Sequence, residues 1–248
     1  MKILVTGHKG FLGGEFVKKY GQDYEIIGYD HKDGDELLDY ENLKDKIQDC
    51  EQVVHLAAIP KPVDGKTFED YFSNNVQATF NVIKASFENK VKRVIYASST
   101  TIYGIEKGIP FSTPITESQP FVSQYICANS LSCRDDDLSY HMSKVMAEQI
   151  LAWHGLNKKI QTTALRFGPI NKVFLGTSVS INNATQAIKL ALDCDGELWY
   201  EPFSIVDEIP HVDISKAKRI LGYKPEKPNY SKEQIHSTLE DKAKFIKD

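Results

Sequence analysis

Short apolar runs alternate with longer segments of helical periodicity through the first two thirds of this chain. Apolar runs of about four to eight residues bounded by turn signals indicate buried strands, whereas apolar positions three and four residues apart indicate helices. The pattern predicts strands at Lys2–Thr6, Tyr24–Tyr29, Gln52–Leu56, Arg93–Ala97 and Ile160–Arg166, and helices at Phe11–Tyr20, Glu41–Gln48, Thr67–Asn89, Leu138–Trp153 and Asn183–Leu192. This alternation predicts an α/β fold with a doubly wound parallel sheet, because right-handed crossovers place helices on both sheet faces.

Two parts of the chain depart from this alternation. Ile105–Asp137 holds three prolines and many serines and threonines, and we expect it to leave the sheet and return. A loop of this length in a compact domain is usually functional or disordered. Ile205–Pro225 is expected to form a small C-terminal cap on the substrate side, and Lys232–Lys247 a charged amphipathic helix.

Composition places the chain among ordinary globular proteins. Its 248 residues are 41% hydrophobic and 26% charged, so a sizeable core can form without disulfides. A formal net charge of −4 and the lack of a basic stripe argue against nucleic-acid binding. No apolar run reaches the length of a transmembrane helix, and the opening MKILVTG leads directly into a strand, from which we expect no signal peptide.

The spacing of the cysteines does not suggest a zinc site. None of Cys50, Cys127, Cys133 and Cys194 belongs to a CxxC pair. We therefore expect no metal centre. Reduced thiols are typical of cytoplasmic proteins, and we expect this protein in that compartment.

A glycine-rich loop lies between the first expected strand and the first expected helix. Gly7, Gly10 and Gly13 have the spacing G-x-x-G-x-x-G within Thr6–Gly13. Glycines let the backbone turn tightly and approach a pyrophosphate, and the amides of a helix N-terminus attract its negative charge. In this strand–loop–helix context the motif predicts a dinucleotide site.

Asp30 stands at the end of the second expected strand. A carboxylate at this place accepts hydrogen bonds from the ribose hydroxyls of adenosine and repels a 2′-phosphate. The sequence therefore favours NAD over NADP as cofactor. His31 and Lys32 offer a phosphate some positive charge, which leaves NADP as the less expected alternative.

Tyr140 and Lys144, in the stretch YHMSK, lie on one face of the expected helix because they are four residues apart. A free tyrosine has a pKa near 10, and a neighbouring ammonium group lowers it by favouring the phenolate. Tyr140 is then able to take the proton of a carbinol hydroxyl as hydride leaves for NAD, or to return it during reduction. Lys144 is placed to bind the nicotinamide ribose.

Polar side chains follow the fourth and fifth expected strands. Ser99 and Thr100 are expected at the carboxyl edge of the sheet, where ligands bind in doubly wound folds and where a hydroxyl can orient a substrate oxygen. Arg166 ends the next strand. It either clamps a substrate carboxylate or phosphate or serves as a structural arginine. The expected substrate contacts are Ser99, Thr100 and Arg166.

Several motifs extend this pattern over nearly the whole chain. They are TGHKGFLG, Asp30, HLAA at His55–Ala58, NNVQATFNVIKA at Asn74–Ala85, YASSTTIYG at Tyr96–Gly104, YHMSK, TTALRFGP and DISKAKRILGYKP at Asp213–Pro225. Together they resemble the extended short-chain dehydrogenases/reductases, and more closely the NAD-dependent sugar epimerase/dehydratase family. The resemblance implies an NAD-binding Rossmann domain over residues 1–168, with helix 138–153 carrying YxxxK. It also implies a small substrate-binding region over 169–248 that is interleaved with the core.

Carried over position by position, the resemblance implies a catalytic triad of Ser99, Tyr140 and Lys144. Glu36 and Leu37 would flank the adenine, and Asn75 would lie near the nicotinamide. The full set of implied cofactor contacts is Gly7, Gly10, Phe11, Leu12, Gly13, Asp30, Glu36, Leu37, Leu56, Ala57, Ala58, Asn75, Tyr140, Lys144, Phe167 and Gly168.

The resemblance also implies a partner subunit. Members of this family commonly form homodimers through a four-helix bundle, built here from the helices expected at Thr67–Asn89 and Leu138–Trp153. Burial of the same apolar helix faces within one subunit is the alternative.

Departures from the family's pattern bear on the substrate. The stretch LRFGPI lacks the asparagine that nucleotide-sugar enzymes usually carry in an NxYGP-like motif, and the segment Gly168–Val179 is short. Both features resemble sugar-acid dehydrogenases such as uronate dehydrogenase, which act on a free sugar acid. Thr100 and Thr101 stand where dehydratases of the family place an Asp-Glu pair, so a 4,6-dehydratase is the least expected sugar reaction.

The interval from Ser99 to Tyr140 is longer than in the family. Its extra residues, around Ser123–Asp137, could form a lid, a dimer contact or a disordered loop. The sequence gives no basis for choosing among these three.

The leading hypothesis is an NAD-dependent oxidoreductase that transfers hydride at a sugar or nucleotide-sugar carbinol, with Tyr140 as acid or base. The hydride either returns to the sugar, as in an epimerase, or leaves as NADH, as in a dehydrogenase or reductase. A free sugar-acid (uronate-like) dehydrogenase is the first alternative. An NAD-binding sensor or scaffold without turnover is the second, although such relatives usually lose the tyrosine or the lysine.

Overall fold

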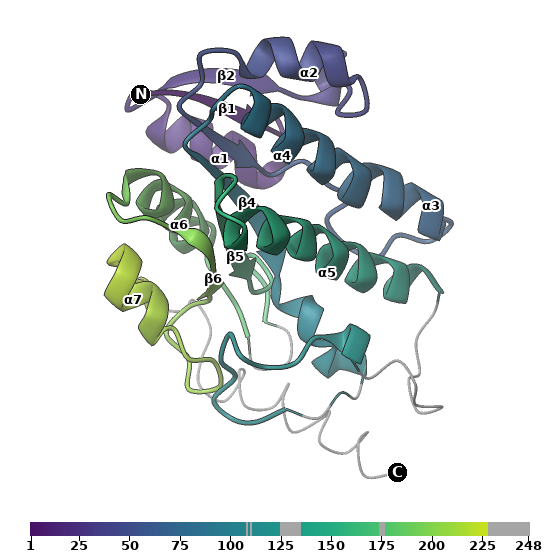
Figure 1. Cartoon of the computed structure of the whole chain (residues 1–248). Helices are drawn as coiled ribbons and strands as arrows, with labels where there is room; N and C mark the ends of the chain where they lie inside the picture. Colours follow the sequence, from purple (N-terminus) through teal and green to yellow (C-terminus); the bar gives the residue numbers. More distant parts are fainter. Residues whose placement is uncertain (108, 110, 125–134, 174–176, 228–248) are drawn as a thin grey trace.

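Six parallel strands form one sheet in the computed structural model, within the residues that it describes (Figure 1). They are β1 (Lys2–Thr6), β2 (Glu25–Tyr29), β3 (Gln52–His55), β4 (Arg93–Ser99), β5 (Gln161–Phe167) and β6 (Trp199–Ile205). Their order across the sheet is β2-β1-β3-β4-β5-β6, and each neighbouring pair is parallel. The predicted doubly wound parallel sheet is therefore confirmed.

The structure describes residues 1–227 except 108, 110, 125–134 and 174–176. The helix expected at Lys232–Lys247 lies outside these residues, as do Cys127, Cys133 and most of the segment Ser123–Asp137.

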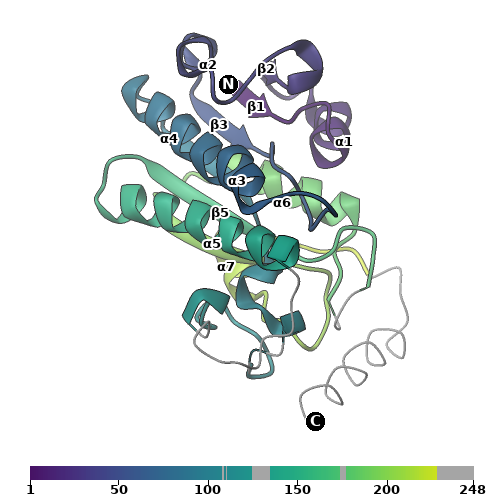
Figure 2. The same cartoon turned by 90° about the vertical axis from the view of Figure 1, so that its right-hand side faces the viewer.

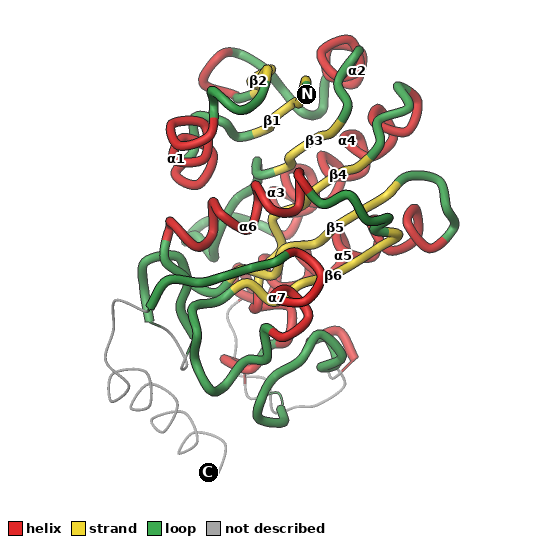
Figure 3. Tube along the Cα trace, turned by 90° about the vertical axis from the view of Figure 1, so that its left-hand side faces the viewer, coloured by secondary structure: helices red, strands yellow, loops and turns green. Residues whose placement is uncertain are grey.

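Helices cover both faces of the sheet, which Figure 2 and Figure 3 show from opposite sides. The side chains of α2, α4 and α5 pack on one face, and those of α1 and α6 pack on the other. The helices are α1 (Phe11–Tyr20), α2 (Tyr40–Ile47), α3 (Phe68–Tyr71), α4 (Ala78–Glu88), α5 (Asp135–Leu156), α6 (Ile181–Asp193) and α7 (Ser215–Leu221). Shorter turns are η1 (His31–Asp33), η2 (Phe72–Gln77), η3 (Thr100–Tyr103), η4 (Ile105–Lys107) and η5 (Val122–Gln124).

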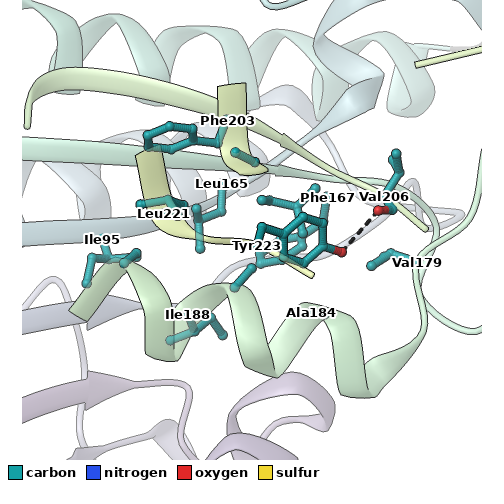
Figure 4. Packing of buried hydrophobic residues seen from close by; sticks show 14 of the residues in the cluster. Ile95, Leu165, Phe167, Val179, Ala184, Ile188, Phe203, Val206, Leu221 and Tyr223 are labelled. Carbon is teal, nitrogen blue, oxygen red and sulfur yellow. Dashed lines mark hydrogen bonds between the residues drawn. The ribbon is translucent and has the colours of Figure 1, made fainter. Parts of the chain in front are cut away.

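Apolar side chains fill the space on each side of the sheet. On the α6 side, Ile188 belongs to a buried cluster that Figure 4 shows in part. Within this cluster the Tyr223 hydroxyl donates to the Val206 carbonyl (3.0 Å). On the opposite side, Val82 and Leu151 belong to a second buried cluster between the sheet and α4 and α5. The central strands are buried on both faces, which accounts for their continuous apolar sequences.

Strand β6 is an element that the sequence pattern did not predict. Its sequence WYEPFSI places Glu201 and Pro202 in the middle of the run. Because β6 lies at the edge of the sheet, the missing N–H of proline leaves no ladder bond unmade. Residues beyond 168 thus contribute a strand to the same sheet as β1–β5, and the boundary expected at residue 168 stays a prediction.

The single helix expected at Thr67–Asn89 is divided in the structure. Thr67 caps α3 through a capping box with Asp70, and a π turn, η2, separates α3 from α4. Asn75 lies in this π turn and is buried. Turns of this kind occur frequently at functional sites.

The strand order reverses between β1 and β3. Loops that leave the sheet on the two sides of such a reversal diverge, and ligands bind in the crevice between them. Here the glycine loop follows β1, and the loop that begins at Leu56 follows β3. The fold therefore places the predicted cofactor residues on the two sides of one crevice.

Candidate active site

A cavity of about 690 Å³ lies at this edge of the sheet. Ligand pockets commonly measure about 300–1,000 Å³. The predicted site residues that line it are Gly7, Gly10, Phe11, Leu12, Gly13, Asp30, Leu56, Ala57, Ala58, Ser99, Thr100, Tyr140, Lys144, Phe167 and Gly168. The structure thus brings together most of the residues that the sequence singled out.

The glycine loop needs its glycines for steric reasons. Gly7 has a φ of +71°, and a Cβ at this position would lie 2.8 Å from the backbone nitrogen of Ala57. A Cβ on Gly13 would strike the carbonyl oxygen of Gly7. Gly10 begins α1 with no side-chain cap, so the first amides of this helix are left for a ligand. This cradle fits the pyrophosphate of a dinucleotide.

Asp30 lines the cavity although it is 4% exposed. Its carboxylate accepts hydrogen bonds from the backbone amides of Lys9 (2.9 Å) and Lys32 (3.0 Å). Burial by itself would raise the pKa of Asp30, but these hydrogen bonds outweigh it and hold the pKa below its ordinary value. The carboxylate is therefore ionised at neutral pH, as an acceptor for ribose hydroxyls requires.

Three predicted catalytic side chains meet at the cavity. Tyr140 and Lys144 come from α5, and Ser99 comes from the end of β4. The Nζ of Lys144 donates to the Ala97 carbonyl (3.0 Å). The ring of Tyr140 packs edge-on against that of Tyr71, with centroids 6.2 Å apart. The four-residue spacing that predicted a shared helix face therefore places both functional groups at one ligand site.

Burial lowers the pKa of Lys144 to about 8, and the negative charge of Glu148 opposes part of this shift. The ammonium form still predominates at neutral pH. A cation at this place favours the phenolate of Tyr140 over the phenol.

Arg166 does not line the cavity, which differs from its expected contact with substrate. Its side chain is buried, and its Nε and Nη2 pair with Glu148. Its Nη1 donates to the Tyr103 hydroxyl and to the Glu117 carbonyl, both at 2.9 Å. Each guanidinium nitrogen has a protein partner, which favours the structural alternative for Arg166, and its contact with substrate stays a prediction.

Glu148 is a buried residue that the sequence interpretation missed. Besides Arg166, its carboxylate accepts from the Ser98 hydroxyl (2.6 Å) and the Tyr200 hydroxyl (2.9 Å). Glu148 follows Lys144 by four residues and so shares its helix face. A carboxylate on the face that carries the predicted catalytic pair is the signal that could have identified it.

Three predicted cofactor contacts lie away from the cavity lining. Asn75 is buried, and its side-chain amide bonds both backbone groups of Ile59 (2.8 and 3.2 Å). These hydrogen bonds hold the loop after β3, whose neighbouring residues Ala58 and Pro60 line the cavity. Glu36 and Leu37 lie in the turn before α2, and their carbonyls accept hydrogen bonds from other side chains. Their contact with adenine stays a prediction.

The excursion after β4 forms one wall of the cavity. Ile105 and Ile115 line it, together with Val212 from the segment expected to cap the substrate side. The Ile115 N–H donates to the His211 carbonyl, and the Ile115 carbonyl accepts from the Asp213 N–H, both at 2.8 Å. The two sequence regions that lacked regular patterning therefore meet at this wall of the cavity.

Two lysines line the cavity without having been assigned a role from the sequence. Lys61 follows β3 and stands between two prolines, and Lys172 follows β5. Both side chains are exposed. They give the mouth of the cavity positive charge.

Known proteins resemble this chain in sequence and in fold. The model of the NAD dependent epimerase/dehydratase family matches residues 3–170. A UDP-glucose 4-epimerase from Lactobacillus helveticus is 27% identical over 225 residues, which are 79% of this chain and 62% of that protein. An L-arabinose 1-dehydrogenase (NAD(P)(+)) from Haloferax volcanii is 23% identical over 253 residues, which are 90% of this chain and 96% of that protein. The chain thus spans less than two thirds of the length of the epimerase.

Among solved structures, the UDP-glucuronic acid 4-epimerase from Bacillus cereus in complex with NAD matches with a TM-score of 0.74 at 20% identity. The match covers 99% of this chain and 100% of that chain, and it shows that the two share a fold. In the described part of the chain, no helix has the length and apolar character needed to cross a bilayer. The same residues contain no group of three or more His, Cys, Asp or Glu placed to hold a metal ion.

Proposed function

Because this chain belongs to the NAD dependent epimerase/dehydratase family, we propose that it transfers hydride between NAD and a carbinol of a sugar or nucleotide sugar. The family is one of NAD-dependent enzymes. The observation that carries the proposal is the shared cavity, in which Ser99, Tyr140 and Lys144 face the same space as the glycine loop and Asp30.

The chain's own residues supply proton transfer and orientation, while bound NAD supplies the hydride acceptor. Tyr140 takes the proton of the carbinol hydroxyl at its phenolate oxygen and returns it in the reverse direction. The buried ammonium of Lys144 favours that phenolate. Ser99 holds the reacting oxygen beside Tyr140. A hydride that returns to the same sugar gives an epimerase, and NADH release gives a dehydrogenase or reductase.

A free sugar-acid dehydrogenase is the second candidate, and the segment after β5 supports it. The N–H of Val179 donates to the Pro169 carbonyl (3.1 Å), and the N–H of Asn171 donates to the Val179 carbonyl (2.8 Å). The two ends of this short segment therefore meet, which favours a small substrate over one that carries a nucleoside diphosphate. Lys61 and Lys172 at the cavity mouth suit a substrate carboxylate.

Turnover of a small panel distinguishes these candidates. The panel contains UDP-glucose, UDP-glucuronic acid, L-arabinose and glucuronate, each with NAD. Steady growth of NADH absorbance with L-arabinose or glucuronate supports the dehydrogenase, whereas epimer formation without net NADH supports the epimerase. NAD binding with no turnover of the panel supports a sensor or scaffold, the third candidate.

Substitution of Tyr140 tests the assigned acid and base. We expect Tyr140→Phe to lower kcat by about 10²–10⁴-fold, the usual contribution of a positioned acid or base. The affinity for NAD, measured by titration calorimetry, is expected to change little. Tyr20→Phe removes one hydroxyl from the end of α1 and serves as the matched control. Full activity of Tyr140→Phe contradicts the mechanism.

We also propose that the protein is a homodimer, through a four-helix bundle in which each subunit contributes α4 and α5. In Figure 1 and Figure 2 these two helices lie side by side on one face of the sheet. Phe80, Phe87 and Trp153 are exposed on them. Lys159 lies over the rings of both Phe87 and Trp153, so these two side chains are neighbours. Contiguous apolar patches mark interaction surfaces. A cytoplasmic location remains part of the proposal and rests on the cysteine pattern, with Cys50 and Cys194 both free thiols.

A further inference from the structure

A series of buried hydrogen bonds runs behind the cavity, from the strand before the glycine loop to the helix that carries Tyr140. It begins where Thr6 Oγ1 lies 2.7 Å from Nδ1 of His55, and Nε2 of His55 lies 3.0 Å from Thr79 Oγ1. All three side chains are fully buried. A polar group in this position must find its partner within the protein.

The proton positions follow from the donors and acceptors present. The Thr79 hydroxyl donates its hydrogen to the Asn75 carbonyl (2.5 Å), so toward His55 it acts as an acceptor. His55 therefore carries its hydrogen on Nε2. In a neutral imidazole the other nitrogen is then an acceptor, so Thr6 donates to Nδ1.

Thr6 connects this series to the cofactor loop. Because its hydrogen is directed at His55, its lone pairs accept from the amides of Leu56 and Ala57, each at 3.2 Å. Both of these residues line the cavity. The imidazole thus fixes the direction of the Thr6 hydroxyl, and that hydroxyl holds the loop.

Asn75 connects the series to the catalytic helix. Its Nδ2 donates to the Ser143 hydroxyl (2.9 Å), which donates to the carbonyl of Tyr140 (2.7 Å). The same side-chain amide bonds both backbone groups of Ile59, at the far end of the loop after β3. Asn75 and Ser143 are buried.

We propose that His55, as the neutral Nε2–H tautomer, is a positioning residue that couples the cofactor loop Leu56–Ile59 to the helix turn carrying Tyr140. It acts through Thr6 on one side and through Thr79 and Asn75 on the other. An imidazolium would break the series, because a protonated Nδ1 no longer accepts from Thr6.

The surroundings keep the ring neutral. Burial, together with a smaller effect of the ammonium of Lys144, lowers the pKa of His55 to about 3. The ring of Tyr96 packs against the imidazole with centroids 5.6 Å apart, and the two threonine hydroxyls bond its nitrogens. The tautomer is therefore constant over the neutral and mildly acid range.

Nitrogen-15 NMR of the imidazole in the full-length protein tests the tautomer. We expect a protonated Nε2 and an unprotonated Nδ1, unchanged from neutral to mildly acid pH. A protonated Nδ1, or an imidazolium at mildly acid pH, overturns the proposal.

The affinity for NAD, measured by titration calorimetry, tests the positioning. His55→Phe keeps a planar ring but removes both hydrogen bonds, and we expect the Kd for NAD to rise about tenfold, the equivalent of one to two hydrogen bonds. Thr79→Val should produce a similar rise. The variant carrying both His55→Phe and Thr79→Val should show no larger rise in Kd than either single variant, because the two groups act in one series. His55→Asn keeps an acceptor for Thr6 and should recover part of the affinity.

His154→Phe is the matched control. His154 is buried on the same helix as Tyr140, its Nδ1 pairs with the Ile150 carbonyl (2.8 Å), and it does not line the cavity. This variant should lower the melting temperature while leaving the Kd for NAD unchanged. Equal effects of His55→Phe and His154→Phe on that Kd overturn the proposal. Thr79→Val and His55→Asn carry the test if His55→Phe does not fold.

Amide hydrogen exchange tests the part of the series that runs from His55 through Thr79 and Asn75 to the helix carrying Tyr140. Peptides spanning Leu138–Lys144 should exchange faster in His55→Phe than in the wild type, and at the wild-type rate in His154→Phe. Unchanged exchange in a folded His55→Phe variant excludes the coupling to Tyr140.

Discussion

Lys144 keeps a positive charge in a place where burial opposes it. Its side chain is 4% exposed, and burial lowers its pKa from 10.5 to about 8. A shift of this size corresponds to roughly 3 kcal/mol of unfavourable free energy at neutral pH. The residue that we propose prepares Tyr140 for proton transfer therefore reduces the stability of the fold, as catalytic groups often do.

Replacement of this lysine should separate stability from activity. Lys144→Met keeps an unbranched chain of similar length without the charge, and we expect it to raise the free energy of unfolding at pH 7 by about 2 kcal/mol while activity is lost. Urea denaturation measures the first effect and the turnover panel the second. Lys18→Met, at a highly exposed position of α1, is the control and should change stability by less than about 0.5 kcal/mol.

The stability gained by Lys144→Met should depend on pH. The folded pKa of Lys144, about 8, lies below the unfolded value of 10.5, so between these values the unfolded chain binds the proton more tightly. The wild type therefore gains stability as the pH rises through this window, and the advantage of the variant shrinks. An advantage that grows between pH 8 and 10.5 contradicts the assignment.

At the scale of single residues, the sequence identified candidate site residues where a reactive type of side chain occurs at a characteristic spacing. Tyr140 and Lys144 were singled out by spacing and Ser99 by the family resemblance, and the structure places all three in one cavity. Their catalytic roles stay predictions. Arg166 could not be assigned, because a strand-end arginine serves a ligand or a buried carboxylate equally well. Its partner Glu148 is fixed by the packing of α5 against β5, which the local sequence does not record.

At the scale of elements, periodicity predicted β1–β5, including the edge strand β2, and missed β6 at the other edge. β1 and α1 begin and end where the pattern placed them. β6 was not predicted because its proline and glutamate interrupt the apolar pattern, and an edge strand tolerates both residues. The π turn η2 escaped because one inserted residue hardly alters the spacing of apolar positions along a helix.

Alanine substitutions at two adjacent glycines, Gly13 and Gly14, should have different effects on NAD binding. A Cβ on Gly13 would strike the backbone carbonyl of Gly7, which cannot move without opening the loop. We expect Gly13→Ala to weaken NAD binding by more than about tenfold, the equivalent of about 1.4 kcal/mol, in titration calorimetry.

Gly14→Ala is the matched control, one residue further along α1. A Cβ there meets its nearest neighbour, the His8 carbonyl oxygen, at 3.9 Å, an ordinary contact. Alanine should therefore preserve NAD affinity and stabilise the helix by about 0.5–1 kcal/mol. Equal losses of affinity in the two variants would show that the loop tolerates no side chain at all.

At the scale of the whole molecule, the face that carries α4 and α5 differs from the rest of the surface. Phe80 and Phe87 are each 44% exposed, and Trp153 is 54% exposed. Apolar side chains of this size are costly to leave in water, and their burial against a second subunit would remove that cost.

Disruption of this face should yield monomers. We expect the wild type to sediment as a dimer and Phe80→Asp as a monomer with unchanged circular dichroism, because a buried carboxylate opposes association. Sedimentation velocity is the measurement. Phe11→Asp changes an exposed phenylalanine of α1, which packs on the opposite face of the sheet, and should remain dimeric. A monomeric wild type contradicts the proposed bundle.

The contacts of Ile115 in the cavity wall bear on the order in which parts of the protein fold during synthesis. Ile115 pairs with residues 211 and 213, and the Glu117 carboxylate accepts from the Ser204 N–H (2.7 Å). These partners leave the ribosome long after β1–β4, which form the cofactor side. Contacts between such distant positions form late, since loop closure must precede them. We therefore expect the nascent chain to acquire its nucleotide crevice first, and to enclose the proposed site of sugar chemistry as one of the last steps of its folding.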